Sequence, residues 1–269
     1  MALKNIFTIA CLLLSTCIYN ICTAKTPKTQ YKLIWKDEFK GKSFNTNFWS
    51  KIPRGNVDWK RYMSDHEPLY KVKNGKLTLY GIANNDIVPN DTAKFLTGGL
   101  YTKNKITLRY GKVEIKARLQ AAQGVWPAIW LLPETGKWPD AGEIDIMEHL
   151  NHDKFVYQTV HTYYTHVLNN KQNPPHSAKA KIKTGQYNIY AVEILPDKII
   201  FSVNGKRTHI YPKIETTSPK QYPFGTPYYI LIDMQIEGAW VGKASVQELP
   251  AKMEIDWIKI YERIINKCP

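Results

Sequence analysis

Residues 112–119 read Lys-Val-Glu-Ile-Lys-Ala-Arg-Leu, and charged and apolar side chains alternate through the whole stretch. In an extended strand, successive side chains point to opposite faces. The stretch therefore predicts a strand with one face in an apolar core and the other face in water. A sheet of such strands needs a second layer to cover its apolar face.

The sequence on either side of this stretch favours antiparallel neighbours. Asn74-Gly75 and Asn204-Gly205 each separate two short apolar runs, and Asn-Gly readily takes the positive φ angles of a type I′ hairpin turn. Met253, Ile255 and Trp257 alternate in the same way and predict a last strand. Residues 83–93 and 169–180 are rich in Asn and Pro, so we expect long loops there.

No segment after residue 24 carries apolar residues at helical spacing over a dozen positions, so helices should be short or absent. Many short strands without crossover helices predict an all-β fold, an antiparallel β-sandwich of jelly-roll type. Residues 25–269 show no repeat or linker and are long enough to bury one large core, so we expect a single domain.

Residues 1–24 are typical of a signal peptide, with Lys4, an apolar run over residues 6–14 and a small-residue cleavage site ending at Ala24. We therefore expect an exported protein, which is periplasmic, secreted or held at the cell surface. Residues 14–17 also resemble a lipoprotein signal with Cys17 as the lipidated residue, although Thr16 is a poor match. No later stretch reaches the roughly 20 apolar residues of a membrane-spanning helix.

The charge and cysteine pattern limits the possible partners. The formal net charge is +14, carried by scattered lysines. This charge fits a solvated surface or attraction to a polyanion such as a sulfated or sialylated glycan. No arginine-rich helix or stacking motif suggests a nucleic acid partner. Only Cys268 lies outside the leader, so no internal disulfide is expected, and we expect a monomer.

The chemistry concentrates in residues 142–149, Gly-Glu-Ile-Asp-Ile-Met-Glu-His. Glu143 and Asp145 share one face of a strand, whereas strict alternation would turn Glu148 toward the core. One extra residue, a β-bulge between Asp145 and Glu148, would return Glu148 to the carboxylate face. We predict this bulge. The plainer alternative is three acidic residues on a solvated strand.

With the bulge, the carboxyl groups of Glu143 and Glu148 would lie roughly 5–6 Å apart. That matches the separation of about 5–5.5 Å in retaining glycosidases rather than the wider separation in inverting ones. Glu143 would then be the nucleophile and Glu148 the acid/base. Because crowded carboxyls cannot all ionise, Asp145 should help to raise one pKa, which we assign to Glu148.

Aromatic residues flank the acidic strand. Trp126, Trp130 and Trp138 offer flat faces for the C–H side of a sugar ring, although each could also fill the core. Tyr157 and His161 share a polar strand face that suits a cleft wall. His161 could bind a sugar hydroxyl or tune a carboxylate, and an ordinary surface histidine fits equally well.

These motifs together resemble glycoside hydrolase family 16, whose Glu-x-Asp-x-x-Glu signature matches residues 143–148. The resemblance covers nearly the whole chain after the leader, including residues 35–39, 110–114, 126–130 and 253–257. It implies a concanavalin-like jelly roll of two antiparallel sheets and retaining cleavage of internal β-linkages. It also implies Glu143 as nucleophile, Asp145 as its support, Glu148 as acid/base, and a glycone site lined by Trp126, Trp130, Trp138 and His161.

No cofactor is expected for catalysis, but the resemblance implies a structural calcium ion with candidate ligands at Asp256, Glu38 and Gly75. For the substrate, residues 233–242 depart from the pattern usual in β-1,3-glucanases. Together with residues 61–65 and 157–161, they are more similar to endo-β-galactosidases of mucin O-glycans and keratan, which adds Tyr157, Gln158 and Trp240 as substrate-binding candidates. An endo-β-1,3(4)-glucanase and a non-catalytic carbohydrate-binding protein are the alternatives.

Overall fold

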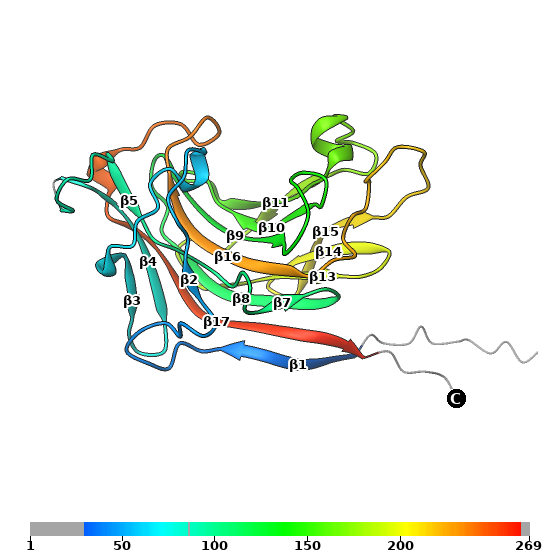
Figure 1. The fold of residues 1–269 in the computed structure, drawn as a ribbon, viewed down its shortest axis with the longest axis horizontal. Helices are drawn as coiled ribbons and strands as arrows, with labels where there is room; N and C mark the ends of the chain where they lie inside the picture. Colours follow the sequence, from blue (N-terminus) through cyan, green and yellow to red (C-terminus); the bar gives the residue numbers. More distant parts are fainter. Residues whose placement is uncertain (1–29, 86, 265–269) are drawn as a thin grey trace, which may run out of the picture.

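The computed structural model describes residues 30–85 and 87–264, and these fold into two antiparallel sheets packed face to face (Figure 1). The all-β jelly-roll prediction is confirmed. The expected signal peptide, residues 1–24, and Cys17 lie outside the described residues. Among the helices that the structure describes, none has both the length and the apolar character needed to cross a bilayer.

The outer sheet faces away from the cleft and is centred on β8, the strand formed by the alternating stretch described above. Its main order is β15-β14-β13-β8-β17-β4-β3, with β1 paired to β17 and β5 paired to β4. Its strands are β1 Gln30–Asp37, β3 Tyr70–Val72, β4 Leu77–Ala83, β5 Phe95–Thr97, β8 Gly111–Leu119, β13 Asn188–Ile194, β14 Lys198–Val203, β15 Lys206–Pro212 and β17 Ala251–Ile264.

The second sheet, called the cleft sheet because its residues line the cleft described below, is strongly curved (Figure 1). Its main order is β12-β11-β10-β9-β16-β6-β2, and β7 pairs with β16. Its strands are β2 Ser50–Lys51, β6 Gly99–Tyr101, β7 Thr107–Leu108, β9 Val125–Pro133, β10 Glu143–Glu148, β11 Phe155–His161, β12 Ser177–Lys181 and β16 Tyr228–Ile236.

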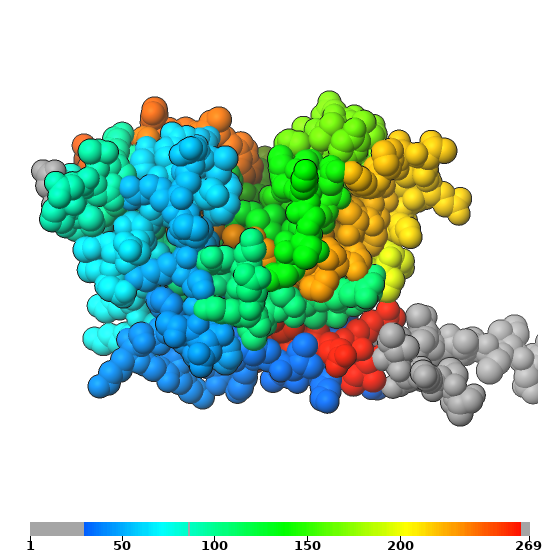
Figure 2. Space-filling model, viewed as in Figure 1, coloured from blue at the N-terminus to red at the C-terminus, as the bar shows by residue number. Residues whose placement is uncertain are grey.

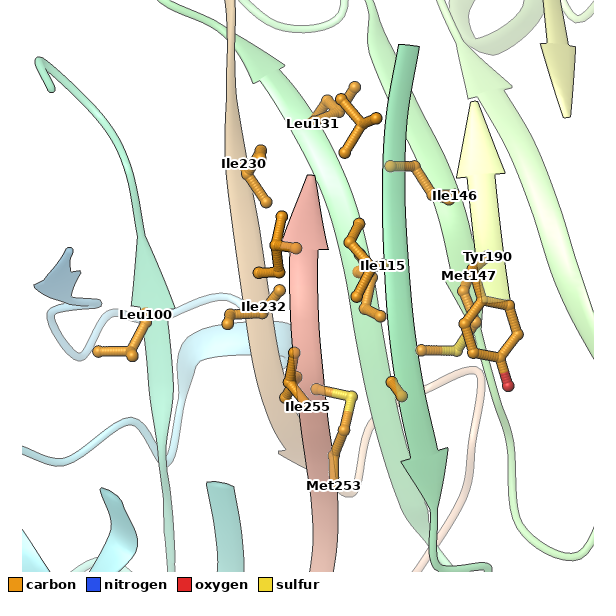
Figure 3. Packing of buried hydrophobic residues seen from close by; sticks show 14 of the residues in the cluster. Leu100, Ile115, Leu131, Ile146, Met147, Tyr190, Ile230, Ile232, Met253 and Ile255 are labelled. Atoms are coloured by element: carbon orange, nitrogen blue, oxygen red, sulfur yellow. The ribbon is translucent and has the colours of Figure 1, made fainter. Parts of the chain in front are cut away.

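The main core lies between the two sheets and is built from the apolar side of each alternating strand. On β8, Val113, Ile115 and Ala117 are fully buried, while the charged residues between them reach solvent. Figure 3 shows Ile115 packed near side chains of the cleft sheet, including Ile146 and Met147. The large apolar area removed from water is the main force that holds the sheets together.

The helices are short, as expected: η1 Asp58–Lys60, η2 Glu67–Leu69, η3 Tyr163–Val167 and η4 Val246–Glu248. Both predicted hairpins are present, with positive φ at Asn74-Gly75 between β3 and β4 and at Asn204-Gly205 between β14 and β15. The long loop after β4 is present. The loop predicted for residues 169–180 is wrong at its end, because Ser177–Lys181 forms β12, an edge strand paired with β11.

Candidate active site

The predicted bulge is present on β10. Asp145 pairs with Thr159 of β11 and Glu148 pairs with Tyr157, so three residue steps on β10 face two steps on β11. The pairing with β9 shifts at the same place. Ile146 and Met147 both enter the core (Figure 3). Glu148 consequently returns to the cleft face, the side that already carries Glu143 and Asp145.

Gly142 lets the chain enter β10 at the required angle. Its φ is +85°, and a Cβ at this position would lie 2.8 Å from both the Phe224 ring and the Tyr228 hydroxyl. The Tyr228 hydroxyl donates to the carbonyl of Ala141. A larger residue at position 142 would therefore be strained and would push Glu143, its neighbour, out of place.

The three acidic residues open into one cleft. Figure 2 shows the outline of the molecule hollowed between the blue segment that carries η1 and the yellow-green segment that carries η3. Most of the lining comes from the cleft sheet, with additions from η1, from the residue before it and from the β9–β10 loop. The lining residues are Val57, Trp59, Trp126, Ala128, Trp130, Leu132, Trp138, Glu143, Asp145, Glu148 and Gln235.

Two tryptophan indoles each donate a hydrogen bond to one of the two glutamates. Trp126 Nε1 donates to Glu148 Oε1 at 3.1 Å, and Trp138 Nε1 donates to Glu143 Oε2 at 2.6 Å. An indole N–H donates a hydrogen bond and does not accept one. It can therefore contact the carboxyl group in both the neutral and the ionised form. Trp126 and Trp138 thus line the cleft, and each contacts one glutamate.

Burial is the largest cause of a raised pKa at all three carboxyls. Burial, followed by the charge of Asp145, raises the pKa of Glu143 to about 8. Burial raises the pKa of Asp145 to about 7. The pKa of Glu148 is raised well above its usual range by burial and by the charges of Asp145 and Glu143. His161 and the Trp138 N–H oppose the rise at Glu143. At Glu148 the Trp126 N–H opposes the rise, but the charges of Asp145, Glu143 and Asp233 add to it, so Glu148 retains its proton more strongly than Glu143 does.

His161 lies beside the acidic strand. Its Nε2 is 3.3 Å from Asp145 Oδ2. Donor atoms of His161, Asp145 and Glu143 all lie within 4.8 Å of one another, close enough to share one metal ion. Because two of the three are carboxyls with raised pKa values, the same arrangement also suits a cluster that shares protons.

A line of aromatic rings continues from Trp126 along the cleft edge. Trp240 contacts Trp126 edge-on with ring centres 5.1 Å apart, and Tyr157 contacts Trp240 at 4.9 Å. Trp240 is 47% exposed. An exposed, supported indole presents a rigid apolar face to solvent. The structure therefore places Tyr157 and Trp240 beside the cleft, where the sequence predicted them.

The structure corrects the prediction for Gln158. Its side chain is fully buried between the sheets, on the same strand face as Val156 and Val160. Strand alternation sends Tyr157 and Gln158 to opposite faces, so both cannot face the cleft. The prediction that Gln158 binds substrate directly is wrong in this structure.

A fourth acidic residue, Asp233, lies next to the cleft lining and was not predicted from the sequence. Asp233 is fully buried on β16, and it accepts hydrogen bonds from Trp130 Nε1 at 2.8 Å and Gln235 Nε2 at 2.7 Å. Its pKa is raised by burial to about 7. Trp130 also packs edge-on against Trp59, at 4.8 Å. The available signal was a single acid within the apolar run 228–236.

The candidate calcium ligands lie on the outer side. Asp256 Oδ2 is 2.7 Å from Lys116 Nζ, and the Glu38 carboxylate pairs with Lys36 and Lys40. Gly75 lies near the Glu38 carbonyl. A calcium ion needs six to eight oxygen ligands. Because the Asp256 and Glu38 carboxylates are already paired with ammonium groups, these side chains do not fit a calcium site as arranged.

Two carboxyl groups that face one cleft, as Glu143 and Glu148 do here, are typical of glycoside hydrolases. Residues 60–259 match the family described as Glycosyl hydrolases family 16. The chain belongs to this family.

Two curated relatives differ in the substrates that they are named for. The chain is 34% identical over 253 residues to the keratan-sulfate endo-1,4-β-galactosidase of Sphingobacterium multivorum, a match that covers 92% of this chain and 58% of the relative. It is 32% identical over 186 residues to a β-glucanase of Rhodothermus marinus, covering 64% of each. The chain therefore spans about three fifths of the length of these relatives.

Solved structures show the same fold. The laminarinase from Rhodothermus marinus superposes with a TM-score of 0.79 at 24% identity, covering 88% of this chain and 99% of that one. A structure from work on endo-acting O-glycanases of the human gut microbiota, which initiate mucin breakdown, has a TM-score of 0.74 at 28% identity. It covers 85% of this chain and 98% of the other.

Proposed function

We propose that this protein is an endo-acting, retaining β-glycoside hydrolase that cleaves internal linkages of galactose-containing glycans of the poly-N-acetyllactosamine, mucin O-glycan or keratan type. The main support is the β10 bulge, which brings Glu148 into the same cleft as Glu143. A strand without the bulge would leave only one of these glutamates in the cleft.

The reaction would proceed by double displacement. The Glu143 carboxylate attacks the anomeric carbon while Glu148 gives its proton to the departing glycosidic oxygen, and a glycosyl-enzyme ester forms. Glu148 then takes a proton from water as the water oxygen attacks the same carbon, which releases Glu143 and restores the starting protonation. Asp145 and His161 would hold Glu143 in position.

The raised pKa values support this division of roles. A general acid must keep its proton at the working pH, and at Glu148 burial and the charges of Asp145 and Glu143 outweigh the Trp126 N–H, which favours the ionised form. Glu143 must ionise to attack, and it has the Trp138 N–H and His161 as stabilising neighbours. Proton loss from the cluster should therefore occur first at Glu143 or Asp145 rather than at Glu148.

The preference for galactose-containing glycans has separate support. The relative with 34% identity is named for keratan-sulfate cleavage and matches nearly all of this chain. The net charge of +14 suits an anionic polymer such as a sulfated or sialylated glycan. The exposed Trp240, which belongs to the stretch that departs from the usual glucanase pattern, flanks Trp126 in the cleft.

A β-1,3(4)-glucanase is the second candidate, because a β-glucanase and several laminarinases are among the similar proteins. A panel of laminarin, lichenan, mucin and keratan sulfate, with products sized by chromatography, separates the two. We expect oligosaccharides from mucin or keratan sulfate. Rapid laminarin breakdown with no action on mucin or keratan sulfate would overturn the substrate assignment.

Catalysis itself is tested with Glu143→Gln, which keeps the shape and removes the nucleophile. We expect kcat to fall at least about 1,000-fold. Glu254→Gln, on the outer sheet, is a matched control that should keep activity. NMR of the first product should show the β-anomer. Wild-type rates in Glu143→Gln would reject the nucleophile, and an inverted product would reject double displacement.

Export is part of the proposal and rests on residues 1–24 alone. Such a leader suits an enzyme whose polymeric substrate lies outside the cell. N-terminal sequencing of the mature protein would distinguish cleavage after Ala24 from processing before Cys17.

A further inference from the structure

The β10 bulge interrupts the regular pairing of β10 with its neighbouring strands inside the core. Ile146 has no Cα partner on either neighbouring strand, and Gln158 is the single β11 residue opposite Ile146 and Met147. A bulge disrupts the ladder of backbone hydrogen bonds at this point. A buried backbone carbonyl at such an irregularity is costly if it stays unpaired, so a side-chain donor there stabilises the bulge.

Gln158 supplies that donor with its side chain. Its Nε2 donates to the Ile146 carbonyl at 3.1 Å, and the whole side chain is inaccessible to solvent. The amide orientation is fixed from the other end, because Thr208 Oγ1 donates to Gln158 Oε1 at 2.5 Å. One amide thus satisfies two polar groups within the core.

Thr208 belongs to a second irregularity, on the opposite sheet. In the pairing of β14 with β15, Phe201 faces His209 and Ser202 faces Arg207, so Thr208 is an extra residue of β15. The two bulges therefore meet through Gln158, which lies on the cleft sheet while Thr208 lies on the outer sheet.

We propose that Gln158 is a positioning residue, which holds Glu148 in the cleft by tying the carbonyl of the β10 bulge to Thr208 of the outer sheet. The inference rests on the proposed function, since Glu148 is taken as the acid/base. Glu148 lies two residues beyond Ile146, so a bulge that moves or slips carries the Glu148 carboxyl with it. Glu143 lies before the bulge and keeps its place.

Because a displaced bulge would move Glu148 and leave Glu143 in place, we expect a Gln158 variant to be impaired in proton donation and not in nucleophilic attack. Gln158→Met keeps the size of the side chain and removes both hydrogen bonds. Misplacing a catalytic group by about 1 Å can cost on the order of 100-fold. We expect kcat/KM on the natural glycan to fall about 10- to 100-fold, with the loss mainly in kcat.

A substrate with an activated leaving group separates positioning from general damage. A dinitrophenyl β-glycoside of a released oligosaccharide needs little protonation, and kcat/KM reports only the step that forms the glycosyl-enzyme. Gln158→Met should therefore lose less than about threefold on this substrate. Thr208→Val should show a smaller loss with the same leaving-group dependence, and Thr208→Ser should behave as wild type.

Gln221→Met is the matched control. Gln221 is also a buried amide between two backbone groups, donating to the Pro212 carbonyl at 3.0 Å and accepting from Ile214 N at 3.1 Å, away from the cleft. It should lower Tm without a leaving-group effect. Equal losses on both substrates in Gln158→Met, in proportion to its fall in Tm, would overturn the inference.

A measurement without substrate keeps this inference distinct from the proposed function. The indole N–H resonance of Trp126 reports its hydrogen bond to Glu148 Oε1. It should shift in Gln158→Met and Thr208→Val and stay unchanged in Gln221→Met. An unchanged resonance in folded Gln158→Met would reject the positioning role, even if the enzyme cleaved the expected glycan. Failure of the wild type on every glycan would instead reject the proposed function.

Discussion

Replacing Glu143 with glutamine removes a carboxyl whose pKa is raised to about 8 by burial and by the charge of Asp145. Between its ordinary pKa and this raised value, the folded protein keeps a proton that the unfolded chain releases. The free energy of unfolding of the wild type should therefore fall as the pH rises through this interval. Glutamine does not titrate, and it can still accept the hydrogen bond from Trp138 Nε1.

The size of the effect follows from the shift. The Glu143 pKa rises from 4.5 to about 8, and at about 1.36 kcal/mol per pKa unit the upper limit is about 5 kcal/mol. Glu143 is partly exposed and shares protons with Asp145, so we expect about 2 kcal/mol. For a domain of this size, that corresponds to a Tm about 4–8 °C higher than wild type at pH 8. At pH 5 the two proteins should differ little.

Thermal unfolding of both proteins at pH 5 and pH 8 measures this difference. Glu254→Gln is a control for which the expected change in stability has the opposite sign. Burial raises the Glu254 pKa, but hydrogen bonds from Arg118 and Lys252 outweigh burial and bring the pKa below its usual value. That variant should lose stability at pH 8, where the carboxylate is ionised. Equal stabilisation of Glu143→Gln at both pH values, or a loss of stability at pH 8, would contradict this prediction.

Three further outcomes follow from the cleft and the outer sheet. Trp240→Ala should raise KM about 5- to 30-fold through loss of a supported sugar platform, with little change in Tm; an unchanged KM would remove Trp240 from substrate binding. His161→Gln should raise the Glu143 pKa and move the acid limb of kcat/KM to higher pH, and a shift to lower pH would contradict this. Calcium should raise Tm by less than about 2 °C over EDTA, because the Asp256 carboxylate is already paired; titration calorimetry would show tight binding if this is wrong.

Features set by local chemistry were predictable from the sequence. The Asn74-Gly75 and Asn204-Gly205 turns need only residues that accept positive φ, and both form as expected. The β10 bulge was predictable for a different reason. Only an extra residue lets Glu143 and Glu148 share a face while the apolar residues between them stay buried.

Features set by distant contacts were not predictable. Ser177–Lys181 becomes a strand because it pairs with β11, and its own sequence is too polar to indicate this. Gln158 was assigned to the cleft by its neighbours, while its hydrogen-bond partner Thr208 lies 50 positions away on the other sheet. Asp233 was overlooked because its donor Trp130 comes from a different part of the chain.

The pairing of β1 with β17 determines where a tag or a tether can be joined without covering the cleft. Gln30 lies opposite Ile264 in that pair, so the two ends of the described chain leave the body together, along the outer sheet, which faces away from the cleft (Figure 1). A tag, a resin or a lipid tether attached next to Gln30 or Ile264 would therefore leave the cleft accessible, and immobilised protein should keep the activity of the free protein.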